Sequence, residues 1–191
     1  MRSLKSYLGS TGFSVNGSVS AKIILFDVDN TLIHTTAKIG VRRNGKLMKH
    51  LTDQEYNDYI LKAGEAFDFS EFADPDILNN EALTPYWNTL EREYRKGTHI
   101  GILTARGDCD LIRNFLIKKG IDIKKSLIFA TDDPRLGLSG RVQDRKAEVI
   151  TRLYNLGYRT FVFFDDNDNN LRSVKKMEDI YDDINIILKK V

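Results

Sequence analysis

The most constraining feature of this chain is a short apolar run that ends in two carboxylates. Residues Ile23–Phe26 are apolar, and Asp27 and Asp29 follow at once within the stretch Lys22–Thr31. A short apolar run bounded by polar residues is typical of a buried strand. Acids at the carboxyl end of such a strand lie where open α/β sheets bind ligands. Aspartate and asparagine are also common turn formers, so this segment alone fits a simple strand cap as well.

Strands and helices alternate through most of the chain. Beyond the first strand, Lys22–Phe26, the apolar runs that resemble strands are His99–Leu103, Ser126–Ala130, Thr160–Phe164 and Ile184–Leu188. The helical patterns between them have predicted starts at Thr84 (with Pro85 as the first helical residue), Asp108, Asp144 and Asp168. This alternation predicts an α/β fold, in which helices flank a parallel sheet with right-handed crossovers.

Two segments interrupt the alternation after the first strand. Residues 38–50 form a basic hairpin around Asn44-Gly45, the strongest local hairpin signal. The hairpin fits either a solvated element whose lysines protect its edges or a flap that steers a phosphorylated substrate. Residues 51–81 are acidic instead, with aromatic residues between the acids. This segment predicts a small insert with a helix from Asp53 to about Lys62.

Composition limits the remaining possibilities. The 191 residues suffice for one domain with a small insertion, so we expect a loose N-terminal arm over residues 1–21 and one main domain over residues 22–191. The net charge of +2 indicates no particular partner. A single cysteine favours a reducing compartment, and we expect a cytoplasmic location. No apolar run approaches the ~20 residues that span a bilayer, so a membrane partner is not expected.

The polar residues that end the predicted strands, or that begin a helix beside them, form a chemically coherent set: Asp27, Asp29, Thr104, Lys146, Asp165 and Asp166. Four carboxylates in one crevice repel each other unless a cation binds or their pKa values rise. Ligands that offer only oxygen favour a hard ion such as Mg²⁺. A threonine hydroxyl and a lysine can hold phosphate oxygens, and a carboxylate can attack phosphorus while a second acid transfers protons.

With these residues, the chain resembles the haloacid dehalogenase (HAD) superfamily of phosphohydrolases. The first superfamily motif, Asp-x-Asp-x-Thr, matches residues 27–31, and the second, a strand that ends in Thr or Ser, matches residues 102–104. Lys146 fits the third motif, a lysine at a helix start. Asp165-Asp166 fits the fourth, with Asn170 at the expected spacing. The resemblance covers about residues 22–188 apart from the insert, and it implies a Rossmann-like HAD-type sheet with a flap at 38–50 and a small cap at 51–81.

The resemblance also implies the role of each residue. Asp27 would be the nucleophile and a metal ligand, and Asp29 would be the general acid/base and would coordinate Mg²⁺ through its carbonyl oxygen. Thr104 and Lys146 would hold the phosphoryl group. Asp166 would be the third ligand, supported by Asp165. The expected activity is Mg²⁺-dependent phosphomonoester hydrolysis through an aspartyl-phosphate; Asp29 disfavours carbon–halogen cleavage, because the superfamily's dehalogenases lack that acid.

The substrate is less constrained than the reaction. A small cap implies an open site, and the motif style is similar to the phosphatase domains of phage polynucleotide kinase-phosphatases, which remove 3′-phosphates. A polynucleotide 3′-phosphatase that acts in nucleic-acid repair is therefore the leading expectation, with Arg42, Arg43 and Arg106 as additional contacts to substrate. Arg106 fits equally well a salt bridge to Asp108 or Asp110. The alternatives are a nucleotide or small-metabolite phosphatase and a non-catalytic binding module.

Overall fold

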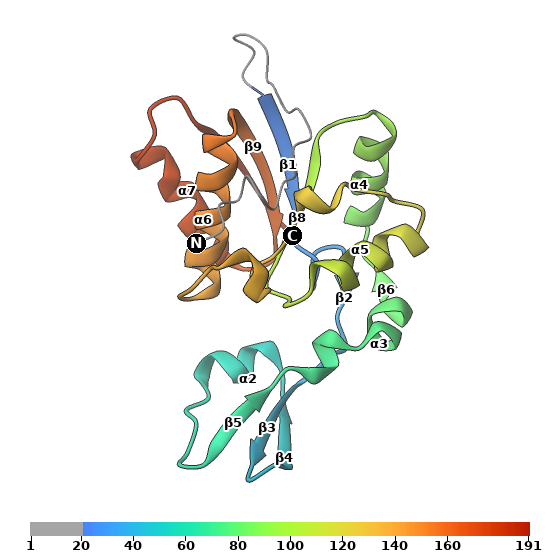
Figure 1. Ribbon diagram of the computed structural model, residues 1–191, viewed down its shortest axis with the longest axis vertical. Helices are drawn as coiled ribbons and strands as arrows, with labels where there is room; N and C mark the ends of the chain where they lie inside the picture. The colour runs from blue at the N-terminus through green and yellow to red at the C-terminus, as the bar shows by residue number, and fades with distance from the viewer. Residues whose placement is uncertain (1–20) are drawn as a thin grey trace. The chain divides into compact units, whose positions relative to one another are not determined.

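The computed structural model describes residues 21–191, which form two compact units (Figure 1). The first unit comprises residues 83–191 and the described part of residues 1–34, and the second comprises residues 35–82. The expected N-terminal arm lies outside the described residues, apart from Ala21, which begins strand β1. No helix in the described range combines the length and apolar character that a membrane span requires.

A five-stranded parallel sheet forms the centre of the first unit, as the alternating pattern predicts. Its strand order is β10-β9-β1-β7-β8, and every neighbouring pair is parallel. The strands are β1 (Ala21–Phe26), β7 (Ile100–Thr104), β8 (Ile128–Ala130), β9 (Tyr158–Asp165) and β10 (Asn185–Lys190). The α/β class with a parallel sheet is therefore confirmed, and the strand limits differ from those predicted by one or two residues.

Four α-helices flank this sheet: α4 (Tyr86–Arg95), α5 (Cys109–Lys118), α6 (Val142–Asn155) and α7 (Asp168–Lys175). Helices α4 and α5 pack on β7 and β8, whereas α6 and α7 pack on β9 and β10 (Figure 1). Right-handed crossovers explain this division, because the connections run one way from β1 to β8 and return through α6 to β9. The two helix pairs therefore cover opposite faces of the sheet.

In the first unit, 3₁₀ turns cover Lys125–Leu127 (η2), Pro134–Leu136 (η3) and Lys176–Asp179 (η4). Strand β2 (Ile33–His34) pairs with β6 (Ala82–Leu83), whose two residues fall at the boundary between the units. Two predicted helix starts were wrong, by three residues for α6 and by one residue for α4. Helix α6 begins at Val142 after Arg141, so Asp144 lies in its first turn rather than at the cap. Pro85 occupies the cap of α4, and the Thr84 hydroxyl accepts a hydrogen bond from the Tyr86 N–H at 3.2 Å.

The core lies on both faces of the sheet around the central strands. On one face, Ile23 pairs across strands with Phe161, which in turn pairs with Ile186, and all three are buried. Gly101 of β7 lies very close to its neighbours on both sides. An added Cβ would lie 2.8 Å from Leu25 Cδ2 and 2.9 Å from the Leu127 carbonyl oxygen. A larger residue at this position would therefore push the strands apart.

The second unit is built on a three-stranded antiparallel sheet. Its elements are β3 (Ile39–Arg43), β4 (Lys46–Leu51), α2 (Asp53–Asp58), β5 (Glu65–Asp68), η1 (Ser70–Ala73) and α3 (Pro75–Asn80). The strand order is β4-β3-β5. Asn44 and Gly45 join β3 to β4 with φ angles of 50° and 79°, as a tight hairpin turn requires. Ile39, Val41 and Leu51 form the small core of this unit.

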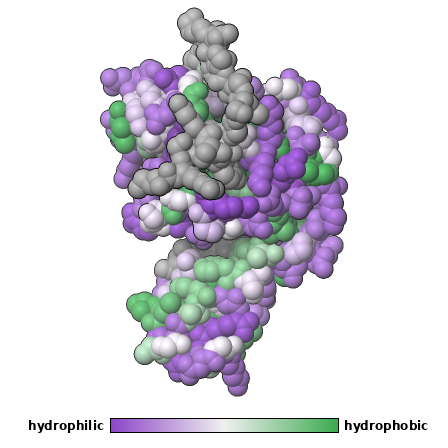
Figure 2. All heavy atoms as spheres, viewed as in Figure 1, coloured by the Kyte–Doolittle hydropathy of each residue, from purple (hydrophilic) through white to green (hydrophobic). Residues whose placement is uncertain are grey.

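The insert predicted over residues 51–81 differs from the structure in two ways. Helix α2 ends at Asp58 rather than near Lys62, and Glu65–Asp68 forms strand β5, which the sequence reasoning missed. Glu65 explains the early end, since its carboxylate accepts hydrogen bonds from the Tyr59 hydroxyl at 2.9 Å and the Lys62 N–H at 2.9 Å. Large apolar side chains reach the surface of this unit, among them Met48, Ile60 and Phe69 (Figure 2).

Candidate functional site

The candidate site lies at the carboxyl ends of the central strands of the first unit. Asp27 follows β1 directly, Asp165 ends β9 and Thr104 ends β7. Because β9, β1 and β7 are neighbours, the three residues lie on one rim of the sheet. The Asp27 N–H donates to the Phe164 carbonyl oxygen at 3.0 Å, which ties the end of β1 to the end of β9. Parallel strands thus place residues from distant parts of the chain side by side.

Three of the predicted carboxylates form a compact acidic cluster: Asp27, Asp165 and Asp166. Each contributes one oxygen, and these oxygens all lie within 4.8 Å of one another. Burial raises the pKa of Asp27 well above its ordinary value, and the charge of Asp165 adds to the effect although Lys146 opposes it. Burial, again with the charge of Asp165, raises the pKa of Asp166 to about 6. The cluster is therefore short of positive charge.

Within the described residues, Lys146 supplies the one ammonium that pairs with carboxylates of this cluster, whereas Lys190 donates to the backbone carbonyl oxygen of Asp166. Its ammonium lies 3.0 Å from Asp27 Oδ1 and 2.7 Å from Asp165 Oδ2, and its side chain is only 1% exposed. Burial alone would lower the pKa of Lys146, but the two carboxylates raise it, so the lysine stays charged. Lys146 lies in the second turn of α6, so the predicted position near a helix start is approximately right.

The Asp165 carboxylate accepts more hydrogen bonds than the Asp166 carboxylate does. Its Oδ1 accepts hydrogen bonds from the Asn167 N–H at 2.8 Å and from Asn170 Nδ2 at 3.0 Å. Its Oδ2 accepts from Lys146 at 2.7 Å and from Asn170 Nδ2 at 3.1 Å. These donors fix the Asp165 carboxylate, which leaves Asp166 the more accessible ligand of the pair. Asn170 was predicted from its spacing, whereas no sequence pattern indicated the backbone N–H of Asn167 as a donor.

Thr104 and Arg106 lie together in the loop after β7. Thr104 is fully buried, and its hydroxyl accepts a hydrogen bond from the Arg106 N–H at 3.3 Å. The Thr104 carbonyl oxygen accepts from the N–H of Thr131, the residue after β8, at 2.8 Å. The Thr131 hydroxyl is buried and has no hydrogen-bond partner among the described residues. The loop therefore brings a backbone turn and hydroxyl groups to the same rim as the acidic cluster.

Arg106 forms an ion pair that the sequence reasoning did not anticipate. Its Nε and Nη2 donate to the two oxygens of Asp29 at 3.0 and 2.7 Å, and its side chain is 1% exposed. A bidentate ion pair of this kind fixes the orientation of a carboxylate. The expected partners were wrong: Asp108 and Asp110 instead pair with Arg135, at 3.3 and 2.7 Å. Asp29 lies outside the acidic cluster, and no signal in the sequence links it to a residue 77 positions away.

Arg42 and Arg43, the arginines expected to contact substrate, belong to the second unit. Arg42 Nε lies 2.5 Å from Asp68 Oδ2, and Arg43 Nη2 lies 3.3 Å from Glu65 Oε1. Both arginines are partly exposed, but their charges are offset by acids on the neighbouring strand β5. The basic character that the sequence predicts for the hairpin is therefore reduced.

The first unit thus gathers three carboxylates, a buried lysine and a buried threonine at one rim, with a bidentate Arg–Asp pair. Oxygen ligands at this spacing could hold a hard divalent cation, because a cation relieves the repulsion that raises the carboxyl pKa values. Comparison with protein-family models, with curated proteins and with solved structures found no significant match to this chain.

Proposed function

We propose that this protein is a divalent-cation-dependent phosphomonoester hydrolase of the HAD type that acts through an aspartyl-phosphate on Asp27. One observation carries the proposal: carboxylate oxygens of Asp27, Asp165 and Asp166 lie within 4.8 Å of one another, and Lys146 contacts two of these residues. Mg²⁺ fits this set, since all the ligands are oxygen atoms and a cation relieves the repulsion between the carboxylates. Asp27 and Asp166 would contact the ion, and the ion would neutralise charge on the phosphate.

The residues divide the reaction into two balanced steps. In the first, a carboxylate oxygen of Asp27 bonds to phosphorus as the bond from phosphorus to the leaving oxygen breaks, and Asp29 gives that oxygen a proton. In the second, water attacks phosphorus and the Asp27–phosphorus bond breaks, while Asp29 takes up the proton from the water. Lys146 offsets negative charge, and Thr104 offers a hydroxyl to the phosphoryl oxygens. Arg106 keeps the Asp29 carboxylate in one orientation.

Two measurements test this proposal: hydrolysis of p-nitrophenyl phosphate, and detection of a phosphoenzyme. We expect hydrolysis that needs MgCl₂ and stops with EDTA, and a phosphoenzyme in acid-quenched wild-type protein incubated with a radiolabelled phosphate ester. Asp27→Asn should show neither, whereas Asp182→Asn, an exposed acid in the turn before β10, should behave as wild type. If wild type and Asp27→Asn both bind Mg²⁺ and are equally inert, the protein is a binding module rather than an enzyme.

The charges of the second unit bear on the choice between two substrate classes. A polynucleotide 3′-phosphatase remains the leading candidate by motif style, but the pairing of Arg42 with Asp68 and of Arg43 with Glu65 favours a second candidate, a nucleotide or small-metabolite phosphatase. A comparison of kcat/KM for a 3′-phosphorylated oligonucleotide, a 5′-phosphorylated oligonucleotide and mononucleotides separates the two. The nucleic-acid candidate requires that Arg42→Glu and Arg43→Glu lower kcat/KM for the oligonucleotide far more than for p-nitrophenyl phosphate.

A further inference from the structure

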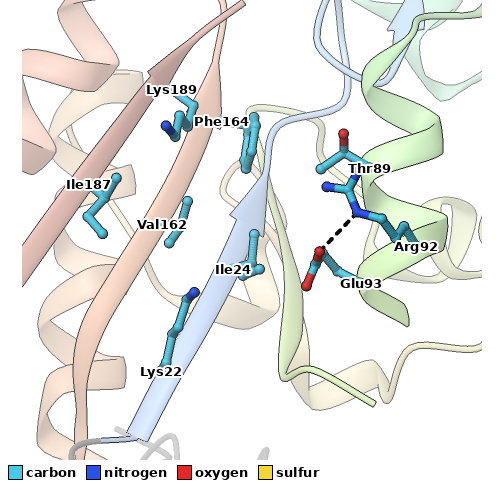
Figure 3. Close-up of a pocket in the computed structure, with 9 residues that line it drawn as sticks. All are labelled: Lys22, Ile24, Thr89, Arg92, Glu93, Val162, Phe164, Ile187 and Lys189. Carbon is cyan, nitrogen blue, oxygen red and sulfur yellow. Dashed lines mark hydrogen bonds and ion pairs between the residues drawn. The ribbon is translucent and has the colours of Figure 1, made fainter. Parts of the chain in front are cut away.

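A pocket separate from the acidic cluster lies in the first unit, on the face of the sheet opposite α6 and α7. Its volume is about 280 Å³, near the lower end of the range for small-molecule sites. Figure 3 shows strand residues on its floor and residues of α4 along one side. The lining residues are Lys22, Ile24, Thr89, Arg92, Glu93, Val162, Phe164, Ile187 and Lys189. We call this pocket the sheet-face groove.

The groove exists because the helices leave part of this face uncovered. Helices α6 and α7 pack on β9 and β10, while α4 contacts β7, two strands away from β9. Ile24, Val162 and Ile187 form one row across β1, β9 and β10, and their exposure rises along it from 5% and 7% to 38%. The equivalent row on the opposite face, under α6 and α7, is fully buried at every position. The groove floor is thus an apolar strip that opens toward β10.

Positive charge surrounds this apolar floor. Lys22 and Lys189 are exposed, and neither side chain has an ion pair or hydrogen bond among the described residues. Arg92 adds a third cation from α4. Among the described residues of the lining, the only acid is Glu93, and it already accepts hydrogen bonds from Arg92 at 3.2 Å and from Lys96 at 3.0 Å. The groove therefore combines an apolar surface with an excess of cations, which favours a ligand that is apolar and anionic.

The outer edge of β10 is poorly suited to pair with an added peptide strand. The Ile186 N–H donates to Glu178 Oε1 at 2.7 Å, and the Ile186 carbonyl oxygen accepts from Lys175 Nζ at 2.9 Å. Side chains thus occupy backbone groups that an added strand would use. A ligand at this side of the sheet would lie on the face rather than extend the sheet.

We propose that the sheet-face groove binds a small organic anion, a compound with an apolar ring and a single carboxylate or phosphate group. The ring would lie on Ile24, Val162 and Ile187, and the acidic group would lie near Lys22 or Lys189. The volume suits one bicyclic ring system. None of these residues belongs to the acidic cluster, so binding does not depend on the proposed hydrolysis.

The test uses 2-naphthoate and its uncharged counterpart 2-naphthamide as probes, titrated into the 191-residue protein and followed by ¹H–¹⁵N NMR. We expect saturable binding of naphthoate at least about fivefold tighter than naphthamide, a difference of about 1 kcal/mol. The shifted amides should include those of Ile24, Val162 and Ile187. The double variant Lys22→Gln/Lys189→Gln should abolish the preference for the anion, whereas Lys118→Gln/Lys176→Gln, two exposed lysines elsewhere, should retain it.

A third variant, Ile187→Glu, places a carboxylate on the floor at a position that is already 38% exposed, so folding should survive. It should weaken naphthoate binding more than naphthamide binding. The proposal is overturned if naphthoate does not bind saturably, if the two probes bind equally, if the control pair of lysines matters as much as Lys22 and Lys189, or if the shifted amides cluster around Asp27 instead.

Discussion

Removal of the Lys146 ammonium should destabilise the protein more than any other loss of a single charge in the first unit. The substitution Lys146→Met keeps most of the side-chain volume but leaves Asp27 and Asp165 without their shared cation. Both carboxylates are buried, so water cannot replace the lost partner. Breaking a buried ion pair by removing one partner typically costs about 3–5 kcal/mol. That loss is a large part of the roughly 5–15 kcal/mol by which a typical domain is stable.

Urea unfolding at pH 7, followed by circular dichroism, measures this cost. Lys96→Met is the matched control, because Lys96 also forms a 3.0 Å ion pair, with Glu93, but is 58% exposed. The control should lose no more than about 1 kcal/mol, as exposed ion pairs do. Since Asp27→Asn removes the charge that Lys146 balances, the double variant Asp27→Asn/Lys146→Met should lose less than the sum of the single variants, with a coupling of about 1–3 kcal/mol.

Two results would refute this reasoning. If Lys146→Met loses no more stability than Lys96→Met, the buried ammonium does not hold the carboxylates together. If the free energies of the two single variants add in the double variant, Lys146 and Asp27 do not act on each other.

Three further predictions concern other parts of the first unit. Burial tends to raise the pKa of Asp133, but hydrogen bonds from Arg135 and from the Cys109 N–H outweigh it and lower that pKa from 3.8 to about 2. The ionised carboxylate therefore contributes fully to the stability of the fold above pH 3.8, and this contribution is lost as the pH falls through about 2. Asp133→Asn should accordingly cost about 1–2 kcal/mol at pH 7 after allowance for the partly exposed Arg135, and much less at pH 2, in urea unfolding at both pH values. Gly101→Ala should cost about 1–3 kcal/mol by overpacking, since no rotamer change moves the Leu127 carbonyl oxygen, and an unchanged urea midpoint would contradict this. If Mg²⁺ binds as proposed, MgCl₂ should raise the Tm of wild type, with about 2.7 kcal/mol of stabilisation at a hundredfold excess over Kd, and Asp166→Asn should abolish that rise. A rise equal to that of wild type would show that Asp166 is not a ligand.

The local sequence sufficed for the parts of the fold that depend on neighbours in the chain. The apolar run Ile23–Phe26 predicted a buried strand, and the Asn44-Gly45 pair predicted a hairpin turn, because periodicity and turn chemistry act over a few residues. The limits of α2 and the strand Glu65–Asp68 were missed for the opposite reason. The hydrogen bonds of Glu65 to the α2 end, and the pairing of β5 with β3, override the local helical pattern.

The candidate site divides in the same way. Each polar residue after an apolar strand could be named from the sequence, since the carboxyl ends of parallel strands share one rim. Only the tertiary structure decided which groups touch: that Lys146 joins Asp27 to Asp165, that Arg106 pairs with Asp29, and that the face of the sheet opposite α6 and α7 keeps an uncovered charged groove. The physical reason is that strand and turn preferences are set by residues a few positions apart. Ion pairs and uncovered faces depend instead on how distant segments pack.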